Sequence, residues 1–234
     1  MIEFGHGTHV GLRRARNEDT YYADPARGLF LVADGMGGHQ HGEVASALVR
    51  DAIVDQLVRG QGLAEAVRGA GERLLRQSND APNELPMGTT VAALRLAGDR
   101  YEVAWVGDSR IYLWQQGALR QVSHDHSLVQ ELVAAGQLDP ALADRHPQRN
   151  VLTQALGVTA IDQLHIGMAR GRAEPGSAFV LCSDGLTESL SDTAIARVVG
   201  RNDLAAQECV DHLLLAALDG SADDNITVIL ARVS

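Results

Sequence analysis

Short apolar runs rich in valine, isoleucine and leucine recur along the chain, separated by turns and polar segments. Runs of this length and composition are typical of β-strands. They predict strands at roughly 4–12, 28–33, 89–96, 101–106, 110–114, 161–169, 178–183 and 225–232. Gln116-Gly117 predicts a hairpin turn between the fifth of these strands and the segment 118–122.

Helical periodicity marks several of the segments between these strands. From residue 42 to 58, the apolar residues that can share one helix face are Val44, Leu48, Ile53 and Leu57. Further helices are expected near 62–77, 127–135, 192–199 and 203–218, and Ser127 can cap the one at 127–135. Because the strands cluster, with helices in pairs between them, the pattern favours antiparallel sheets with helices outside. The predicted fold class is α+β.

Composition narrows the possibilities. With 234 residues, 45% of them hydrophobic, the chain can bury the core of one large domain, expected to span 1–234. The net charge of −10 argues against nucleic acid as a partner, because no basic surplus exists to neutralise phosphates. No stretch approaches about 18–20 uninterrupted apolar residues, so no membrane span is expected. Cys182 and Cys209 are expected to be buried free thiols of a cytoplasmic protein, which nothing requires to be more than a monomer.

Acidic residues stand at the ends of four apolar runs. Asp34-Gly35, Asp108 and Asp184-Gly185 each follow such a run, and Asp224 precedes another. Glu18-Asp19 adds two carboxylates four residues after Arg14. Bringing so many negative charges together is costly unless cations lie among them, and oxygen ligands alone favour Mg²⁺ or Mn²⁺ over zinc. The sequence therefore predicts a site for several metal ions.

Each of these motifs has an ordinary alternative explanation. An Asp-Gly pair after a strand is a common turn, Gly-Asp-Ser occurs by chance, and an arginine near acids can be a solvated surface residue. Their joint occurrence in one chain is what favours the metal site. An arginine beside such a site suggests a phosphoryl substrate, because its planar fork matches phosphate oxygens.

In this order, the motifs resemble those of the metal-dependent protein serine/threonine phosphatases, the PP2C or PPM family, in its compact bacterial form. The resemblance covers essentially the whole chain. The matching segments are 8–19, 33–39, 42–46, 87–90, 105–110, 125–127, 150–157, 181–188 and 224–228. The family resemblance implies a four-layer α-β-β-α sandwich, in which two stacked antiparallel sheets are flanked by helix pairs and the metals lie at one rim.

The resemblance also assigns roles to particular residues. Asp34 matches the carboxylate that bridges two metals, and Arg14 matches the arginine that binds the substrate phosphate; these two are the expected catalytic residues. The other expected metal ligands are Glu18, Asp19, Gly35 through its carbonyl, Asp184 and Asp224, with Asp108 at a third and weaker ion. Segment 137–150 matches a flap that influences substrate access.

The implied reaction is hydrolysis of phosphoserine and phosphothreonine on proteins. Two Mn²⁺ or Mg²⁺ ions would activate a bridging water that attacks phosphorus in line, without a phosphoenzyme. Some relatives carry a histidine two residues after the bridging aspartate as a proposed acid, but Met36 stands there in this chain. His39 is a candidate proton donor, whereas His126 is expected to organise a loop by hydrogen bonding.

The expected partners are phosphoproteins, including a bacterial Ser/Thr kinase and its substrates in a signalling pathway. Two alternatives remain at this level. Gly-Asp-Ser at Ser109, with Asp162-Gln-Leu-His165, mimics a GDSL-type serine esterase, although both blocks are internal and the other acidic motifs would be unexplained. A pseudophosphatase would keep the fold and bind a partner, although every expected ligand position is filled.

Overall fold

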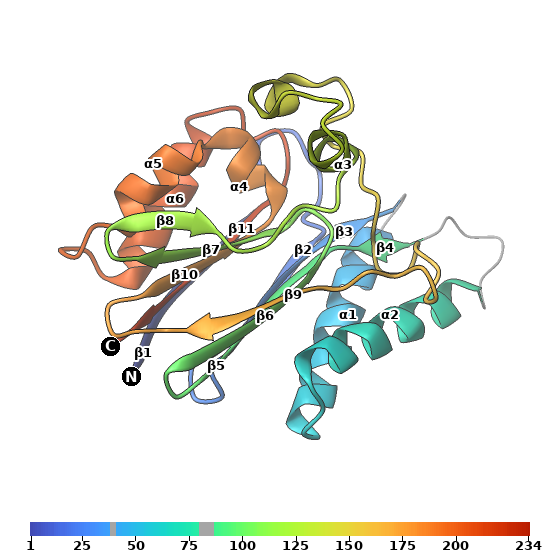
Figure 1. The fold of residues 1–234 in the computed structure, drawn as a ribbon, viewed down its shortest axis with the longest axis horizontal. Helices are drawn as coiled ribbons and strands as arrows, with labels where there is room; N and C mark the ends of the chain where they lie inside the picture. Colours follow the sequence, from blue (N-terminus) through green and yellow to red (C-terminus); the bar gives the residue numbers. More distant parts are fainter. Residues whose placement is uncertain (38–40, 80–86) are drawn as a thin grey trace.

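Two antiparallel sheets lie face to face, with helices on both outer sides (Figure 1). The structure is a computed structural model that describes residues 1–37, 41–79 and 87–234. Within these residues, the first sheet has the order β1 (Ile2–His9), β11 (Ile226–Val233), β10 (Ala178–Cys182), β7 (Arg110–Gln115) and β8 (Ala118–Gln121). The second has the order β2 (Asp19–Asp24), β3 (Leu29–Met36), β5 (Val91–Ala97), β6 (Arg100–Val106) and β9 (Gly167–Arg172), with β4 (Gly88–Thr89) beside β3.

Helices complete the outer layers. The helices α1 (His41–Val58) and α2 (Leu63–Asn79) cover the second sheet. The first sheet is covered by α4 (Asp184–Ser189), α5 (Asp192–Val199) and α6 (Ala206–Leu218). The helix α3 (Leu128–Ala134) and the 3-10 turn η1 (Pro140–Arg145) lie beyond one end of the sheets. The predicted four-layer α-β-β-α sandwich is confirmed.

Three apolar layers hold these elements together. Between the sheets, Phe30 packs in the same cluster as Phe179, while Leu31 on the opposite face of β3 joins Val49 of α1. The third layer lies between the first sheet and its helices and includes Val180. Burying each such side chain stabilises the fold by about 1.5–3 kcal/mol. Because side chains alternate between the two faces of a strand, β3 packs against the other sheet on one face and against α1 on the other.

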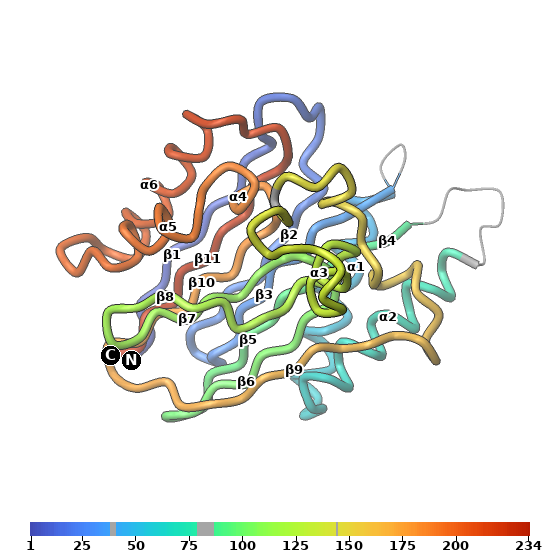
Figure 2. The backbone as a smooth tube through the Cα atoms, turned by 45° about the horizontal axis from the view of Figure 1, so that its top comes forward, coloured from blue at the N-terminus to red at the C-terminus, as the bar shows by residue number. Residues whose placement is uncertain are grey.

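The antiparallel register brings the acidic motifs to one rim. The strands β3, β6 and β10 end at this rim, and β2 and β11 begin there. Asp19 and Asp34 are direct partners in the β2–β3 pairing. The two chain termini lie together at the opposite end, where the Met1 amino group donates to the Ser234 carbonyl at 2.8 Å (Figure 2).

Two predicted strands had wrong bounds, and two elements were not predicted. The strand expected at 161–169 is β9, which begins only at Gly167, because the preceding residues form turns that pack against α2 through Ile161. The first strand ends at His9 rather than near residue 12, because the chain turns at Gly11 with φ of 79°. The strand β2 and the short helix α4 were not predicted. No helix in the described part of the chain is both long and apolar enough to cross a membrane.

Candidate metal and phosphate site

Asp34 lies near the end of β3 and is held there by two threonines. Its backbone N–H donates to Thr90 Oγ1 at 3.1 Å, and its carbonyl accepts from Thr90 N at 2.9 Å and from Thr89 Oγ1 at 2.8 Å. Thr90 Oγ1 is in turn 2.7 Å from Ser109 Oγ. These hydrogen bonds satisfy the Asp34 backbone groups and fix this residue near the end of β3.

Glycines allow the chain to pass very close to this strand end. A Cβ on Gly35 would lie 2.0 Å from the carbonyl oxygen of Gly42, the second residue of α1. A Cβ on Gly42 would lie 2.8 Å from the Gly35 carbonyl oxygen and 2.7 Å from the Glu18 carboxyl carbon. Both positions therefore require glycine, and the start of α1 is packed directly under Glu18 and the Gly35 backbone. The Glu18 carbonyl is fixed by Gly35 N and by Ser46 Oγ, the latter at 2.6 Å.

Asp184 begins α4 immediately after β10, and Ser183 connects it to Asp19. Ser183 Oγ donates to Asp19 Oδ2 at 2.7 Å and accepts from Thr227 N at 2.9 Å. This contact joins the start of β2 in one sheet to the end of β10 in the other. Asp19 Oδ1 and Asp184 Oδ1 are both buried and have no hydrogen-bond partner.

Arg14 and Asp224 close the site on the solvent side. Arg14 Nη2 lies 2.6 Å from Asp224 Oδ2, with exposed side-chain fractions of 55% and 26%. Asn225, which is buried, fixes the loop that carries Arg14. Its Nδ2 donates to the carbonyls of Val10 and Arg16, both at 2.9 Å, and its Oδ1 accepts from Glu18 N at 2.8 Å.

Asp108 lies beside the other acids, at the mouth of a separate cavity. Asp108 and Asp184 both line this cavity of about 300 Å³. Arg110 also lines it and forms a fork with Asp125, with Nη2–Oδ2 of 2.7 Å and Nε–Oδ2 of 2.9 Å. From the expected flap 137–150, Arg149 reaches the cavity and lies 3.9 Å from Glu188 Oε1. The segment 137–150 therefore borders the same cavity as Asp184.

Burial and mutual repulsion make the charged form of these acids unfavourable. Burial raises the pKa of Asp19 to about 6 and that of Asp108 to about 7. The pKa of Asp34 is raised well above its usual value by burial and then by the charges of Asp19 and Asp184. The pKa of Asp184 is likewise raised, by burial and then by Asp108. Such shifts mark a site whose charge balance needs cations.

The donor set fits hard divalent cations. Partnerless, buried carboxylate oxygens on Asp19 and Asp184 are acceptors without a donor, the condition that a cation relieves. Among the described residues, however, no three acidic, histidine or cysteine side chains already converge in a finished metal site. Arg14 holds one oxygen of Asp224, and one expected donor, the carbonyl of Gly35, is not a side chain. Binding would therefore require Arg14 to release Asp224.

All the expected ligands from this rim are thus neighbours in the structure, but some other candidates are not part of it. His39 lies outside the described residues. His126 organises a loop, as expected: its Nδ1 accepts from Gly107 N at 3.2 Å, and its backbone N–H donates to the Gly107 carbonyl. Ser109 is 1% exposed and bonded to Thr90, and His165 packs against His126, so the arrangement is not that of a serine esterase.

Sequence reasoning missed Thr90, Ser183 and Asn225 as supports of the site. Each is a buried polar residue next to a predicted ligand or strand end, and each lies within a segment that matches the family motifs, at 87–90, 181–188 or 224–228, so the sequence did carry a signal for them.

Known proteins are similar to this chain in sequence and in fold. Residues 7–218 match the family described as protein phosphatase 2C. The chain is 40% identical to the serine/threonine protein phosphatase PstP of Mycobacterium tuberculosis over its whole length, but it spans only 45% of that relative. It is 34% identical to the protein phosphatase PhpP of Streptococcus pneumoniae, covering 97% of this chain and 96% of PhpP.

Solved structures agree. The M. tuberculosis PstP/Ppp crystal structure superposes with a TM-score of 0.91 at 35% identity, covering 100% of this chain and 99% of that one. The PstP catalytic domain in complex with two manganese ions gives a TM-score of 0.87 at 34% identity, with 100% and 99% coverage. The family match and these relatives show that the chain belongs to the protein phosphatase 2C family.

Proposed function

We propose that this protein hydrolyses phosphoserine and phosphothreonine on proteins in a reaction that depends on Mn²⁺ or Mg²⁺. The observation that carries this proposal is the combination, at one rim, of buried carboxylate oxygens without partners on Asp19 and Asp184 and the exposed guanidinium of Arg14. The acids need cations, and the arginine has the geometry to bind a phosphoryl group. The phosphatase names of the relatives support the same reaction.

The residues that would hold the ions follow from their places in the fold. Asp34 would bridge two ions, with Gly35, Glu18 and Asp19 on one side. Asp184 and Asp224 would complete the other side, and Asp108 with Asp184 would hold a third, weaker ion. When bound, such ions supply Lewis acidity: they lower the pKa of water at the site and offset negative charge on phosphoryl oxygens.

Arg14 binds and orients the phosphoryl group. Its side chain is half exposed and reaches across the rim to Asp224, so a small rotation moves the guanidinium from a carboxylate to a phosphate. The hydrogen bonds of Asn225 to Val10 and Arg16 keep the loop at the correct distance from the acids.

Transfer of the phosphoryl group goes directly to water. Ser109 is buried and bonded to Thr90, and burial raises the pKa of Cys182 to about 12, so this thiol stays protonated near neutral pH. Neither can act as the nucleophile of a phosphoenzyme. His39 is the candidate that would protonate the leaving serine or threonine oxygen.

The relatives support a proposal about the biological setting. PstP is named a serine/threonine protein phosphatase and PhpP a protein phosphatase, both bacterial, and we propose that this protein reverses a bacterial Ser/Thr kinase, acting on that kinase and its substrates. The phosphatase unit would span residues 1–234, with the flap at 137–150.

The test is hydrolysis of a phosphothreonine peptide by metal-stripped protein, before and after addition of Mn²⁺, with Asp184→Asn alongside. Activity that requires both the metal and the wild-type residue supports the proposal. Metal-independent hydrolysis, or no hydrolysis by folded protein that binds Mn²⁺, would contradict it, and the second result would favour a pseudophosphatase.

A further inference from the structure

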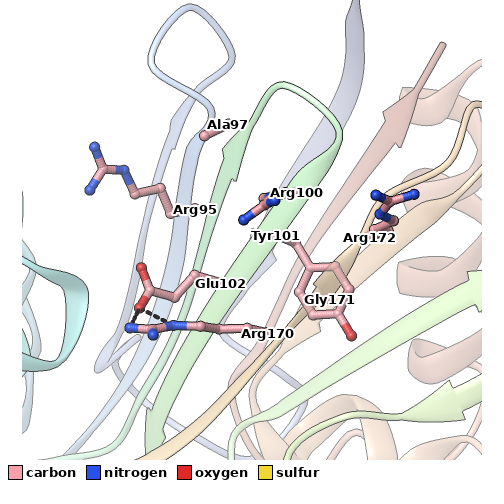
Figure 3. Close-up of a pocket in the computed structure, with 8 residues that line it drawn as sticks. All are labelled: Arg95, Ala97, Arg100, Tyr101, Glu102, Arg170, Gly171 and Arg172. Carbon is pink, nitrogen blue, oxygen red and sulfur yellow. Dashed lines mark hydrogen bonds and ion pairs between the residues drawn. The ribbon is translucent and has the colours of Figure 1, made fainter.

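A pocket lined by four arginines and four other residues lies on the outer face of the second sheet, at the end opposite the acidic rim. Its volume is about 570 Å³. Figure 3 shows it on the neighbouring strands β5, β6 and β9, and its lining residues are Arg95, Ala97, Arg100, Tyr101, Glu102, Arg170, Gly171 and Arg172. We call it the arginine pocket. It holds four arginines and one carboxylate in a chain whose net charge is −10.

The sheet register aligns these side chains in two rows across the strands. Arg95 faces Glu102, which faces Arg170, and one step further along Ala97 faces Arg100, which faces Arg172. Residues in such rows share one face of a sheet and lie about 5 Å from their neighbours. This is the face that α1 and α2 cover further along the strands, through Ala93 and Ala104. The arginines lie on the part of this sheet face that α1 and α2 do not cover.

Two of the four arginines in the pocket have no acidic partner among the described residues. Arg170 is held by Glu102, with Nη2–Oε1 of 2.5 Å and Nε–Oε1 of 2.9 Å. Arg172 lies 3.9 Å from Asp99, and both side chains are largely exposed. Within the described residues, Arg95 and Arg100 form neither an ion pair nor a hydrogen bond through their side chains. Adjacent like charges on a sheet face are destabilising, so an anion bound between them would be favourable.

Protection of a sheet edge does not explain this arrangement. Charged side chains on an edge strand discourage pairing with other sheets, and β9 is such an edge. Arg95 and Arg100, however, lie on β5 and β6, which have partners on both sides. A second hollow of about 310 Å³ adjoins at Arg95 and is lined also by Leu57 and Val58 at the end of α1, so the positive region continues into a partly apolar groove.

We propose that the arginine pocket is a second phosphoryl-binding site, which holds a phosphoserine or phosphothreonine of a protein substrate while another phosphorylated residue of that substrate occupies the acidic rim. Arginine forks match phosphate oxygens, and a pocket surrounds a single group better than a flat surface does. This inference rests on the proposed function of the rim. The strand β5 runs between the two sites, from Val91 next to Thr90 to Ala97, a path of roughly 20 Å at about 3.3 Å per residue.

The experiment compares two peptides that share one sequence. Both carry phosphothreonine near one end, and only one also carries phosphoserine about 12 residues away. Twelve extended residues span about 40 Å, which exceeds the length of β5. Both are hydrolysed by wild type and by Arg100→Glu/Arg172→Glu in the presence of Mn²⁺. The matched control is Arg73→Glu/Arg76→Glu, which makes the same charge change at two exposed positions of α2.

In wild type, the second phosphate is expected to lower KM at least fivefold, with kcat unchanged. The pocket variant should lose this advantage but hydrolyse the singly phosphorylated peptide as wild type does, and the α2 variant should keep the advantage. Equal KM values for both peptides in wild type, or equal losses in both variants, would overturn the proposal. The proposal would also be overturned if a peptide with glutamate in place of the second phosphoserine had the same low KM. It would equally be overturned if the pocket bound anionic vesicles and did not distinguish the two peptides.

Direct binding separates failure of this proposal from failure of the proposed reaction. If wild type hydrolyses neither peptide, fluorescence anisotropy of the labelled peptides still reports the pocket. Tighter binding of the doubly phosphorylated peptide that disappears in Arg100→Gln/Arg172→Gln supports the pocket without any turnover. Equal anisotropy for the two peptides would refute it even if the rim is an active phosphatase.

Discussion

Asp34 is half-buried and surrounded by other acids, so the same carboxylate that serves the proposed reaction destabilises the metal-free fold. We expect Asp34→Asn to reduce turnover at least a thousandfold, because an amide cannot bridge two cations. The same change removes a repelled charge, so metal-free protein should be stabilised by about 1 kcal/mol at pH 8. Phosphopeptide assays with Mn²⁺ and urea unfolding without it check both parts. Full activity of Asp34→Asn would refute the assignment of Asp34 as a metal ligand. A large loss of stability in this variant would refute the expected repulsion between Asp34 and its acidic neighbours.

Arg14 and Arg13 are adjacent, exposed, and each paired with an aspartate, which makes them a matched pair. Arg14 lies 2.6 Å from Asp224 at the rim, and Arg13 lies 2.8 Å from Asp223. Arg14→Ala should raise KM about tenfold and lower kcat less, since a charge-assisted contact to phosphate contributes about 1.5–3 kcal/mol. Arg13→Ala should leave both parameters within twofold of wild type. Similar KM values in the two variants would count against phosphate binding by Arg14.

At this scale, sequence predicts acids better than their supports. Asp34, Asp184 and Asp224 could be predicted as site residues because strand ends are recognisable from apolar runs, and because the motifs resemble a known family. Ser183 and Asn225 were missed as supports. Their importance comes from partners far away in sequence, such as Asp19 and Val10, which only the folded register brings within reach.

Among the elements, the loop from residue 10 to 18 depends on one buried side chain at the start of β11. Asn225→Ala would remove three hydrogen bonds and leave the Glu18 N–H without its acceptor. We expect the free energy of unfolding to fall by about 2–3 kcal/mol. KM should rise as in Arg14→Ala, because the loop carries Arg14. Urea unfolding and peptide kinetics test this, with the exposed Asn202→Ala as control; an unchanged KM would show that the loop is held by other contacts.

The elements that the sequence did not reveal lack a clear pattern. The strand β2 is half-buried at every position, so Asp-Thr-Tyr-Tyr-Ala-Asp shows no alternation of buried and exposed residues. The helix α4 has only six residues, too few for helical periodicity to register. The residues before β9 are apolar because they pack against α2, which mimics a strand. Tertiary contacts, rather than local preference, decide all three.

His126 connects two loops through a hydrogen bond that needs a neutral ring. Its Nδ1 accepts from Gly107 N, and burial, followed by the nearby His165, lowers the pKa of His126 to about 4. Because this pKa lies below the usual 6.5, the folded state binds fewer protons, and the stabilisation is complete above pH 6.5 and lost as pH falls towards 4. Between pH 7 and 4.5, wild type should therefore lose about 1 kcal/mol more stability than His126→Gln. Parallel pH profiles of the two proteins would contradict this.

Across the whole molecule, the acidic rim is where the two sheets depend on each other. Glu18, Asp19 and Asp34 belong to the sheet covered by α1 and α2, whereas Asp184 and Asp224 lie at strand ends of the other sheet. Ser183 Oγ to Asp19 Oδ2 joins them directly, at 2.7 Å. Glu18 N to Asn225 Oδ1 is a second link, at 2.8 Å, but the carboxylates of Asp34 and Asp184 repel their acidic neighbours. Cations held at the rim would therefore link the sheets as well as serve the reaction.

This linkage predicts a large stabilisation by metal. At Mn²⁺ concentrations about 100-fold above its dissociation constant, one site contributes about 2.7 kcal/mol, which raises Tm by about 5–10 °C in a domain of this size. Differential scanning calorimetry of metal-stripped protein with Mn²⁺, against KCl at equal ionic strength, separates ligation from screening. Asp184→Asn should lose most of the Mn²⁺ shift, since it removes a ligand from one of the two sheets. An equal rise with KCl, or with Asp184→Asn, would mean that the ions only screen the repulsion and do not join the sheets.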